Sequence, residues 1–170
     1  LNHMKIKQAK IQDLEMIMNM YASCVRGMIK NDIDQWDHTY PNSKVITQDI
    51  KHNNYYIYIE NNEIIGGIAI DNNQSPEYLE INWEDKTNQF LCVHRLAVKE
   101  DFWNKGIGQK LMKYAEKIVI IKNLKSIRLD TYSGNPHAMN FYKKINYKQL
   151  GYIYLKPNKN EYYCFEKIIQ

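Results

Sequence analysis

The clearest chemical signal in the sequence is a pair of closely spaced glycines, Gly106 and Gly108, at the predicted start of a helix. Glycine has no side chain to hold a ligand away from the backbone, and the first N–H groups of a helix have no partner within it. Together with the positive end of the helix dipole, these groups form a concave anion site. The loop 103–108 therefore predicts a site for a pyrophosphate.

Other glycine-rich sites fit this loop less well. A P-loop needs Gly-Lys-Ser/Thr, but Gly108 is followed by Gln109, Lys110 and Leu111. A dinucleotide-binding fold needs a third glycine where Leu111 stands and glycines directly after the strand, whereas seven residues separate Val98 from Gly106. A tight turn without a ligand remains the alternative for the glycine pair taken alone.

The elements that must position this loop can be predicted from hydrophobic spacing. Apolar residues at three- and four-residue steps predict a helix over 13–29, started by Asp13 or a neighbour. A loop follows over 31–41, and Ser43 is expected to cap a short helix reaching residue 52. Strands 55–60 and 63–71 form a hairpin, because Asn61 and Asn62 tolerate the positive φ of a tight turn.

The rest of the chain alternates strands and helices. We predict strands over 78–83 and 90–98, a helix over 106–121, a strand over 126–132, a helix over 136–145 and two strands within 147–165. A right-handed crossover then makes strands 90–98 and 126–132 parallel neighbours. The fold class is α/β with a mixed sheet.

Composition supports a single globular domain over residues 1–170. Hydrophobic residues at 44% and charged residues at 25% exclude a disordered or membrane protein. The N-terminus lacks a secretory signal, so a cytoplasmic location is expected. Leu1, Asn2 and His3 are interpreted as vector residues. The three cysteines lack metal-ligand spacing and are predicted to be buried thiols, with no metal site. The net charge of +4 is spread along the chain and does not indicate a nucleic-acid surface.

Two motifs together resemble a known family. Leu96-Ala-Val and Trp103-Asn-Lys-Gly-Ile-Gly are followed some thirty residues later by Asn135-Pro-His-Ala-Met-Asn-Phe-Tyr. This combination resembles the GCN5-related N-acetyltransferase (GNAT) superfamily, small bacterial type. The resemblance implies a mixed, mainly antiparallel sheet whose central parallel strand pair is splayed for CoA and flanked by helices. It also implies an acetyl-CoA-dependent N-acetyltransferase that moves acetyl to a primary amine of a small molecule or peptide by direct attack.

The resemblance assigns the cofactor site position by position. It implies that pantetheine pairs with the backbone of the first central strand, that the loop and helix start bind the pyrophosphate, and that the downstream helix completes the site. Lys105 and Lys143 or Lys144 are candidates for phosphate contacts. Two departures are Trp103, where the family has Gln or Arg, and Asn146, where it often has Gly before an aromatic residue. The implied cofactor-binding residues are Leu96, Ala97, Val98, Trp103, Asn104, Lys105, Gly106, Ile107, Gly108, Gln109, Asn135, Ala138, Phe141 and Tyr142.

The same motifs indicate the catalytic groups. Tyr142 is the candidate acid, because a phenol can donate a proton to the departing thiolate. The family often has a Glu base where Cys92 stands, so His94, two residues on and on the same strand face, is the candidate base. Glu80 and Asp130 are alternatives acting through water. The acceptor pocket is expected to include Trp36, Tyr40, Glu80 and Trp83.

Two other functions keep the same fold. One is a non-catalytic acyl-CoA-binding sensor module, and the other is an acetyltransferase acting on aminoacyl-tRNA. The scattered lysines disfavour the second. The expected partners are the amine substrate and acetyl-CoA, without a membrane, and the protein is predicted to be a monomer or homodimer.

Overall fold

The computed structural model describes residues 5–170, so Leu1, Asn2 and His3 lie outside the described residues. The chain divides into two compact units. The first unit contains Leu1–Ile70, as far as described, and His94–Ala115. The second contains Asp71–Val93 and Glu116–Gln170. Because the strand 90–98 and the helix after it change unit part-way, each unit holds part of both elements. That the whole chain is one domain stays a prediction.

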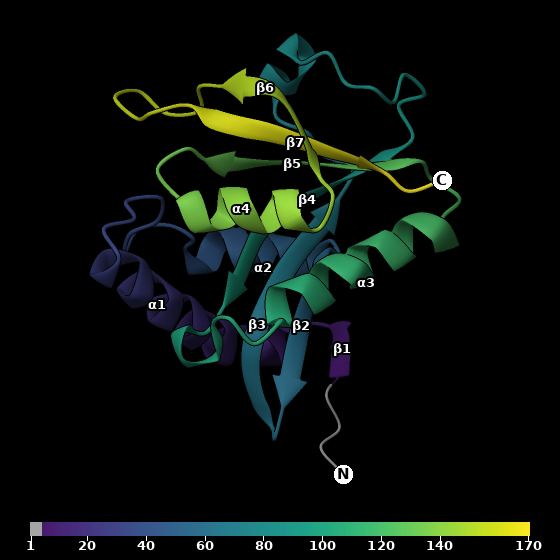
Figure 1. Ribbon diagram of the computed structural model, residues 1–170. Helices are drawn as coiled ribbons and strands as arrows, with labels where there is room; N and C mark the ends of the chain where they lie inside the picture. Colours follow the sequence, from purple (N-terminus) through teal and green to yellow (C-terminus); the bar gives the residue numbers. More distant parts are fainter. Residues whose placement is uncertain (1–4) are drawn as a thin grey trace. The chain divides into compact units, whose positions relative to one another are not determined.

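The predicted α/β class with a mixed sheet is confirmed. Within residues 5–170 seven strands form one sheet in the order β1-β2-β3-β4-β5-β7-β6 (Figure 1). β4 and β5 are parallel, as predicted, and pair from Phe90↔Ser126 to Cys92↔Arg128. The strands are β1 Lys5–Gln8, β2 Tyr55–Glu60, β3 Glu63–Asp71, β4 Phe90–Val98, β5 Ser126–Tyr132, β6 Lys148–Ile153 and β7 Tyr162–Ile168.

The helices also follow the predicted order. Four α-helices are described, together with the short 3₁₀ helices η1 Ile11–Asp13, η2 Pro76–Glu80 and η3 Glu100–Phe102. None of the described helices has the length and apolar character needed to cross a bilayer. The α-helices are α1 Leu14–Lys30, α2 Ser43–Lys51, α3 Ile107–Ile121 and α4 Pro136–Lys144.

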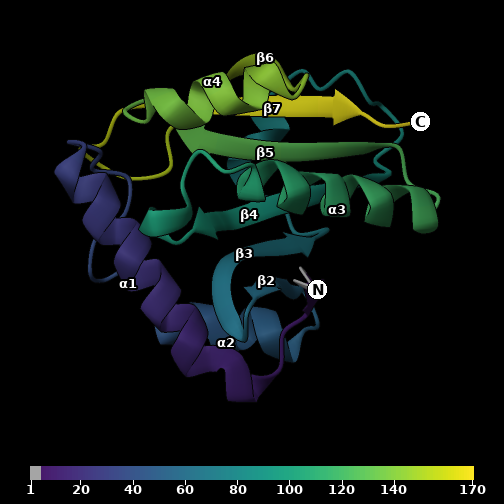
Figure 2. The same ribbon diagram turned by 60° about the horizontal axis from the view of Figure 1, so that its bottom comes forward.

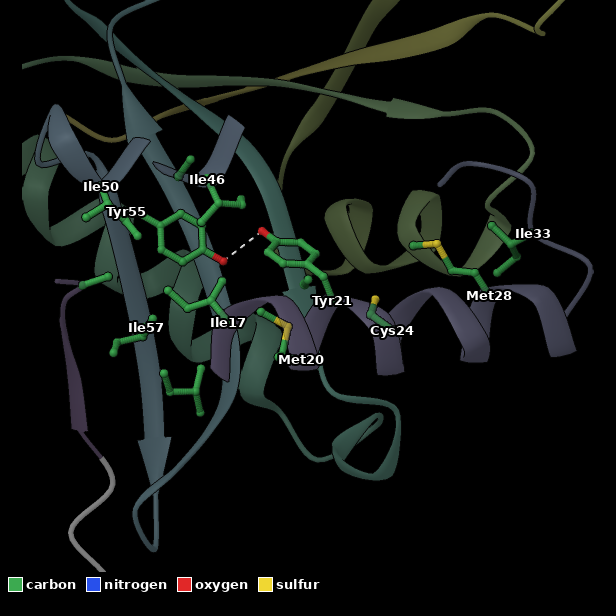
Figure 3. Close-up of a cluster of buried hydrophobic side chains, with 14 residues drawn as sticks. Ile17, Met20, Tyr21, Cys24, Met28, Ile33, Ile46, Ile50, Tyr55 and Ile57 are labelled. Carbon is green, nitrogen blue, oxygen red and sulfur yellow. Dashed lines mark hydrogen bonds between the residues drawn. The ribbon is translucent and has the colours of Figure 1, made fainter. Parts of the chain in front are cut away.

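The first unit has its core between α1, α2 and the strand β2. The apolar face that the three- and four-residue spacing predicts for α1 is buried, with Ile17 and Tyr21 almost inaccessible to solvent. In Figure 3, side chains of α1 lie against Tyr55 of β2 and against Ile46 and Ile50 of α2. This packing fixes the two helices on the strands that they cover (Figure 2).

The second unit has a separate aromatic core. β5 pairs antiparallel with β7 along its whole length, and β7 pairs with β6. Tyr78, Trp83, Tyr132 and Tyr162 pack with Ile153 and with the buried thiols of β4 and β7. All three cysteines, Cys24, Cys92 and Cys164, are free and buried, as predicted.

The predictions for turns and helix ends are confirmed where a single asparagine sets the backbone conformation or caps a helix. Asn61 and Asn62 have φ of 50° and 60° in the β2–β3 turn, and Asn146 has φ of 71° after α4. Asn135 caps α4, its side chain accepting from the N–H of Ala138. The predicted cap of α2 is wrong by one residue, because Asn42 rather than Ser43 accepts from the N–H of Val45.

The predicted strand 78–83 is wrong. Residues Pro76–Glu80 form the 3₁₀ helix η2, which Ser75 and Pro76 begin. The indole N–H of Trp83 then donates to the carbonyl of Tyr78 at 2.9 Å, which folds the segment back on itself. The alternating apolar and polar residues from Leu79 to Trp83 therefore do not form a strand. β1 was not predicted, because four residues are too few to show a pattern.

Candidate active site

The loop that precedes α3 offers unpaired backbone N–H groups. Lys110 is the first residue of the helix whose N–H bonds back, to the carbonyl of Gly106 at 3.1 Å. Within residues 5–170 no acceptor is found for the N–H groups of Ile107, Gly108 and Gln109, as expected for a helix start. Gly106 has φ of 80°, and a Cβ built on it would meet no atom within 4 Å. Gly106 therefore borders open space just before the helix start. A residue with a side chain would be strained at this φ.

Trp103 is held by contacts within the protein. Its indole N–H donates to the carbonyl of Val98 at 2.7 Å, and its backbone N–H donates to Glu100 at 3.1 Å. The ring packs against the first unit's core, where a Cβ on Gly27 would come within 2.6 Å of it. Both N–H groups of Trp103 are thus engaged within the protein, and its place in the cofactor site stays a prediction. It supports the loop from inside.

The remaining loop side chains are mostly in solvent. Asn104, with φ of 61°, Lys105 and Gln109 are exposed. The ammonium group of Lys105 lies 5.2 Å from the centre of the Phe102 ring. The side chain of Ile107 is buried, so only its backbone is available to a ligand. The structure thus leaves backbone amides, with Lys105 as the nearest loop cation, for an anion at this helix start.

The C-terminal half of β4 carries an unusual backbone. Arg95 has φ of 53° inside a strand. For a residue with a side chain, this left-handed conformation costs about 1–3 kcal/mol of conformational free energy. Its carbonyl accepts a hydrogen bond from the hydroxyl of Tyr21 at 2.5 Å, and Tyr21 in turn accepts from Tyr55 at 2.9 Å. Leu96, Ala97 and Val98 follow directly. We call this left-handed residue within β4 the Arg95 bulge. The residues expected to bind pantetheine come immediately after it.

The side chain of Arg95 is held as firmly as its backbone. Its Nε and one Nη donate to the two carboxylate oxygens of Asp49 at 2.8 and 2.7 Å, and the other Nη donates to the Tyr40 hydroxyl at 3.3 Å. Burial alone would lower the pKa of Arg95, but the Asp49 carboxylate outweighs this and raises it. Hydrogen bonds to charged groups contribute about 1.5–3 kcal/mol each, enough to offset the strain at Arg95.

Sequence reasoning missed Tyr21, Asp49, Tyr55 and Arg95 as parts of this arrangement. One signal was present, because Asp49 falls on the buried face of α2 with Ile46 and Ile50. A carboxylate on an apolar helix face needs a charged partner. The tyrosines gave no comparable signal, since their spacing is that of ordinary core residues.

The second unit contains the other half of the predicted cofactor residues. The side-chain oxygen of Asn135 accepts from the N–H of Ala138 at 3.1 Å, so the predicted cap is present. The Tyr142 ring is 7% exposed and contacts the rings of Phe141, Tyr147 and Phe165. Its hydroxyl has no hydrogen-bond partner within residues 5–170. Burial, and secondarily the charge of Asp130, raises the pKa of Tyr142, so the hydroxyl stays protonated and available as a donor.

The candidate bases are in contrasting environments. His94, in the first unit, is half-buried on β4. In the second unit Asp130 accepts from the buried Tyr78 hydroxyl at 2.5 Å, which holds the carboxylate in place. Glu80 is exposed at the end of η2. Burial raises the pKa of Cys92, so its thiol stays protonated and cannot replace the glutamate base that the family often has there.

The four predicted acceptor residues have different surroundings. In the first unit, Trp36 is half-buried with its ring edge-on to Tyr21 at 5.7 Å, and Tyr40 accepts from Arg95. In the second unit, Trp83 is 6% exposed and its ring is tilted against that of Tyr78 in the aromatic core. Its place in an acceptor pocket stays a prediction. Trp36 and Tyr40 remain candidates, as does the exposed carboxylate of Glu80.

Comparison with known proteins agrees with these features. Residues 14–147 match the sequence profile of the acetyltransferase (GNAT) family. The chain belongs to the GNAT family. It is therefore an acetyltransferase of a family that binds CoA, and the resemblance read from the two motifs is confirmed.

Two bacterial relatives show how the similarity is distributed. An uncharacterized N-acetyltransferase of Bacillus subtilis, YesJ, is 23% identical over 163 residues, covering 95% of this chain and 88% of YesJ. The uncharacterized B. subtilis protein YxbD is 44% identical over 82 residues, which is 48% of this chain and 48% of YxbD. The similarity to YesJ therefore extends along nearly the whole chain, and that to YxbD covers about half of it.

Solved structures share the fold. A GNAT family acetyltransferase from Streptococcus agalactiae has a TM-score of 0.82 at 23% identity, covering 97% of this chain and 95% of that one. The PaiA N-acetyltransferase from Thermoplasma acidophilum, solved in complex with coenzyme A, has a TM-score of 0.73 at 18% identity, covering 97% and 98%. At these identities the likeness concerns the fold.

Proposed function

We propose that the protein transfers an acetyl group from acetyl-CoA to a primary amine of a small molecule or peptide by direct attack of the amine. The observation that carries this proposal is the start of α3, where the N–H groups of Ile107, Gly108 and Gln109 lack protein acceptors beside the open space at Gly106. Family membership supplies acetyl transfer and CoA-type binding. The acetyl donor and the amine class are the proposed part.

The residues present suit a pyrophosphate. Backbone N–H groups at a helix start hold anions through hydrogen bonds and the helix dipole, without requiring a side-chain cation. Gly106 lets the backbone come close to such a ligand, because no Cβ occupies the open space there. Lys105 adds a positive charge on the same loop. The loop can therefore bind phosphates although Trp103 replaces a polar residue.

The backbone of β4 suits an extended amide-containing chain. Val98 has its carbonyl engaged by Trp103, which leaves Leu96 and Ala97 as the positions best able to pair with pantetheine. Acetyl-CoA supplies a thioester carbonyl that an amine can attack. A β4 N–H directed at that carbonyl would stabilise the negative charge that develops on its oxygen.

Two side chains are assigned to proton movements. Tyr142 stays protonated because burial raises its pKa, so its neutral hydroxyl donates a hydrogen bond to negative charge developing on the thioester sulfur. His94 accepts the proton that the attacking amine loses, directly or through a water molecule. Trp36 and Tyr40 are proposed to contact the acceptor, with Glu80 attracting a cationic amine.

The test combines binding with turnover in the purified protein. CoA binding is measured by calorimetry for the wild type and for Gly106→Ala, which we expect to bind CoA at least tenfold more weakly. Asn61→Ala is the matched control, because it also places alanine at a positive φ, of 50° in the β2–β3 turn. We expect it to lower the Tm similarly and to leave CoA binding unchanged. Equal CoA affinity in Gly106→Ala and wild type would remove the loop from the site.

Turnover is followed by thiol release from acetyl-CoA with a panel of small amines and peptides. Tyr142→Phe keeps the ring contacts and removes the hydroxyl, so we expect kcat to fall by about 10²–10³-fold, the size expected when a general acid is lost. Undiminished kcat in Tyr142→Phe would remove the proposed acid. CoA binding by the wild type with no turnover on any amine would support the acyl-CoA-binding module instead.

A further inference from the structure

Arg95 brings together several polar groups of the first unit. Two side chains bond to Arg95 directly, Tyr21 from α1 and Asp49 from α2. A third, Tyr55 from β2, bonds to Tyr21. The backbone carbonyl and the guanidinium of the same residue are thereby fixed at once. A surface bulge needs no such arrangement, because water can satisfy its polar groups.

The two tyrosines form a directed chain of hydrogen bonds. Tyr55 donates to Tyr21, and Tyr21 donates to the carbonyl of Arg95. Both rings are buried, and burial raises the pKa of each phenol. Neither hydroxyl ionises over the working pH range, so the direction of donation is constant.

The neighbouring strand makes room for this chain. A Cβ on Gly67 of β3 would overlap the Tyr55 hydroxyl, so the absence of a side chain at this position lets the hydroxyl reach Tyr21. Figure 3 shows the Tyr55 and Tyr21 hydroxyls turned toward one another, joined by the dashed line. The strand sequence, the helix sequence and the bulge are thus matched to one another.

The position of Arg95 in β4 gives this arrangement a consequence. The residues Leu96, Ala97 and Val98 follow it, and a change of φ at Arg95 would rotate every peptide group after it. We propose that Tyr21, Tyr55 and Asp49 are positioning residues, which hold the Arg95 bulge so that the N–H and carbonyl groups of Leu96 and Ala97 are oriented for the acyl-CoA. This inference rests on the proposed function of the β4 backbone.

The first test uses the protein without ligand. Tyr21→Phe retains the ring and removes the hydroxyl that donates to the Arg95 carbonyl and accepts from Tyr55. We expect hydrogen–deuterium exchange in peptides covering 94–98 to become at least tenfold faster than in the wild type. Ser126→Ala is the control, because it also removes one buried hydroxyl donor, that of Ser126 to Asp85 at 2.7 Å in the second unit. It should leave exchange over 94–98 unchanged, and unchanged exchange in Tyr21→Phe would overturn the inference.

The second test uses CoA binding and kinetics well below the Tm of each variant. We expect Tyr21→Phe to weaken CoA binding and to lower kcat, each by about tenfold, whereas Ser126→Ala lowers only the Tm. A purely structural role for Tyr21 predicts a lower Tm with CoA affinity and kcat unchanged, and that result would overturn the inference while the proposed function stands. A wild type that binds no CoA would overturn the proposed function itself, and the inference with it.

A double-mutant cycle separates the two tyrosines. If Tyr55 acts only by orienting the Tyr21 hydroxyl, Tyr55→Phe should weaken CoA binding in the wild type and have no further effect in Tyr21→Phe. Additive effects of the two substitutions on CoA affinity would show that Tyr55 does not act through Tyr21. That outcome would remove Tyr55 from the proposal.

Discussion

Each unit buries one arginine among aromatic rings and carboxylates, but the two arginines are held in opposite ways. Arg95 of the first unit donates two short hydrogen bonds to Asp49, and this carboxylate raises its pKa. Arg128 of the second unit lies 3.7 Å from a carboxylate oxygen of Glu166, its Nε makes no hydrogen bond, and burial lowers its pKa. One arginine is hydrogen-bonded to its carboxylate at both oxygens, and the other lies farther from its carboxylate.

The surroundings of Arg128 explain how it persists. Its guanidinium lies 4.7 Å from the Trp83 ring centre and 4.1 Å from that of Phe90, so cation–π attraction offsets part of the cost of burial. It also donates to the carbonyl of Asp85, while Glu166 accepts from the N–H of Glu84. These bonds fasten the loop before β4 to β5 and β7.

We call Arg95 with Tyr21, Tyr55 and Asp49 the Arg95 cluster, and Arg128 with Glu166, Trp83 and Phe90 the Arg128 cluster. The difference between them indicates different roles. The Arg95 cluster ends on the carbonyl of a strained strand residue next to the proposed acyl-CoA backbone, so loosening it should change binding. The Arg128 cluster ends on loop backbone within the second unit, so loosening it should change stability. Variants of the two clusters can therefore be compared on the same two measurements, Tm and CoA affinity.

The largest effect is expected for Arg128→Ala. It leaves Glu166, 2% exposed, without its cation, and breaking a buried ion pair in this way costs about 3–5 kcal/mol. We expect the Tm to fall by roughly 10 °C, with CoA affinity of the folded protein unchanged. Glu166→Gln is a milder companion variant in case Arg128→Ala does not fold. A tenfold loss of CoA affinity in Glu166→Gln, without unfolding, would contradict the division of roles between the two clusters.

A smaller loss of stability is expected for Asp49→Asn. The amide keeps one acceptor for Arg95 and removes the charge, so we expect a loss of about 1.5–3 kcal/mol, the size of a hydrogen bond to a charged group. In contrast to the Arg128 variant, CoA affinity should also fall. Calorimetry and thermal unfolding of the same preparation check both. Asp49→Glu, which restores the charge, should recover part of the CoA affinity, and an unaltered affinity in Asp49→Asn would remove the distinction between the clusters.

The smallest effect is a pH dependence within the second unit. Burial alone would raise the pKa of Asp85, but hydrogen bonds from Thr87 and Ser126 outweigh it, so the net pKa is lower than the ordinary 3.8. A carboxyl with a lowered folded-state pKa stabilises the fold above its ordinary value and loses this contribution as the pH falls through the folded-state value. We therefore expect the Tm advantage of wild type over Asp85→Asn to be largest near pH 7 and to shrink below pH 3.8.

Glu166 acts in the opposite direction, because burial raises its pKa. Its contribution to stability is greatest below its ordinary value and declines as the pH rises through the raised one. The Asp85→Asn comparison isolates one carboxyl, since Glu166 is present in both proteins. Parallel Tm curves for the two proteins across the pH range would show that Asp85 is not stabilised by its hydrogen bonds.

The sequence predicted elements whose signals are local. Asn61, Asn62 and Asn146 gave their turns, Asn135 gave the α4 cap, and the order of strands and helices gave the parallel β4–β5 pair. The prediction of a strand over 78–83 was wrong because the apolar and polar alternation from Leu79 to Trp83 is also compatible with a 3₁₀ turn that folds Trp83 back on Tyr78.

The candidate site was predictable only as far as motifs reach. The loop and the α4 motif were visible, but the bulge at Arg95 was not, because nothing in β4 itself requires it. The conformation depends on Tyr21 and Asp49, which are 74 and 46 residues earlier in the chain. Likewise Trp103 was read from its place in a motif, whereas its orientation is decided by the space at Gly27.

The indole of Trp103 occupies the space that the missing side chain of Gly27 leaves, because a methyl group at Gly27 would come within 2.6 Å of the indole. A small polar residue at position 103 would leave this space unfilled. A larger residue at position 27 would displace the indole and break its hydrogen bond to the Val98 carbonyl. The orientation of Trp103 therefore depends on the absence of a side chain at Gly27 in α1. The conformation of the loop 103–108 thus depends partly on a residue of α1.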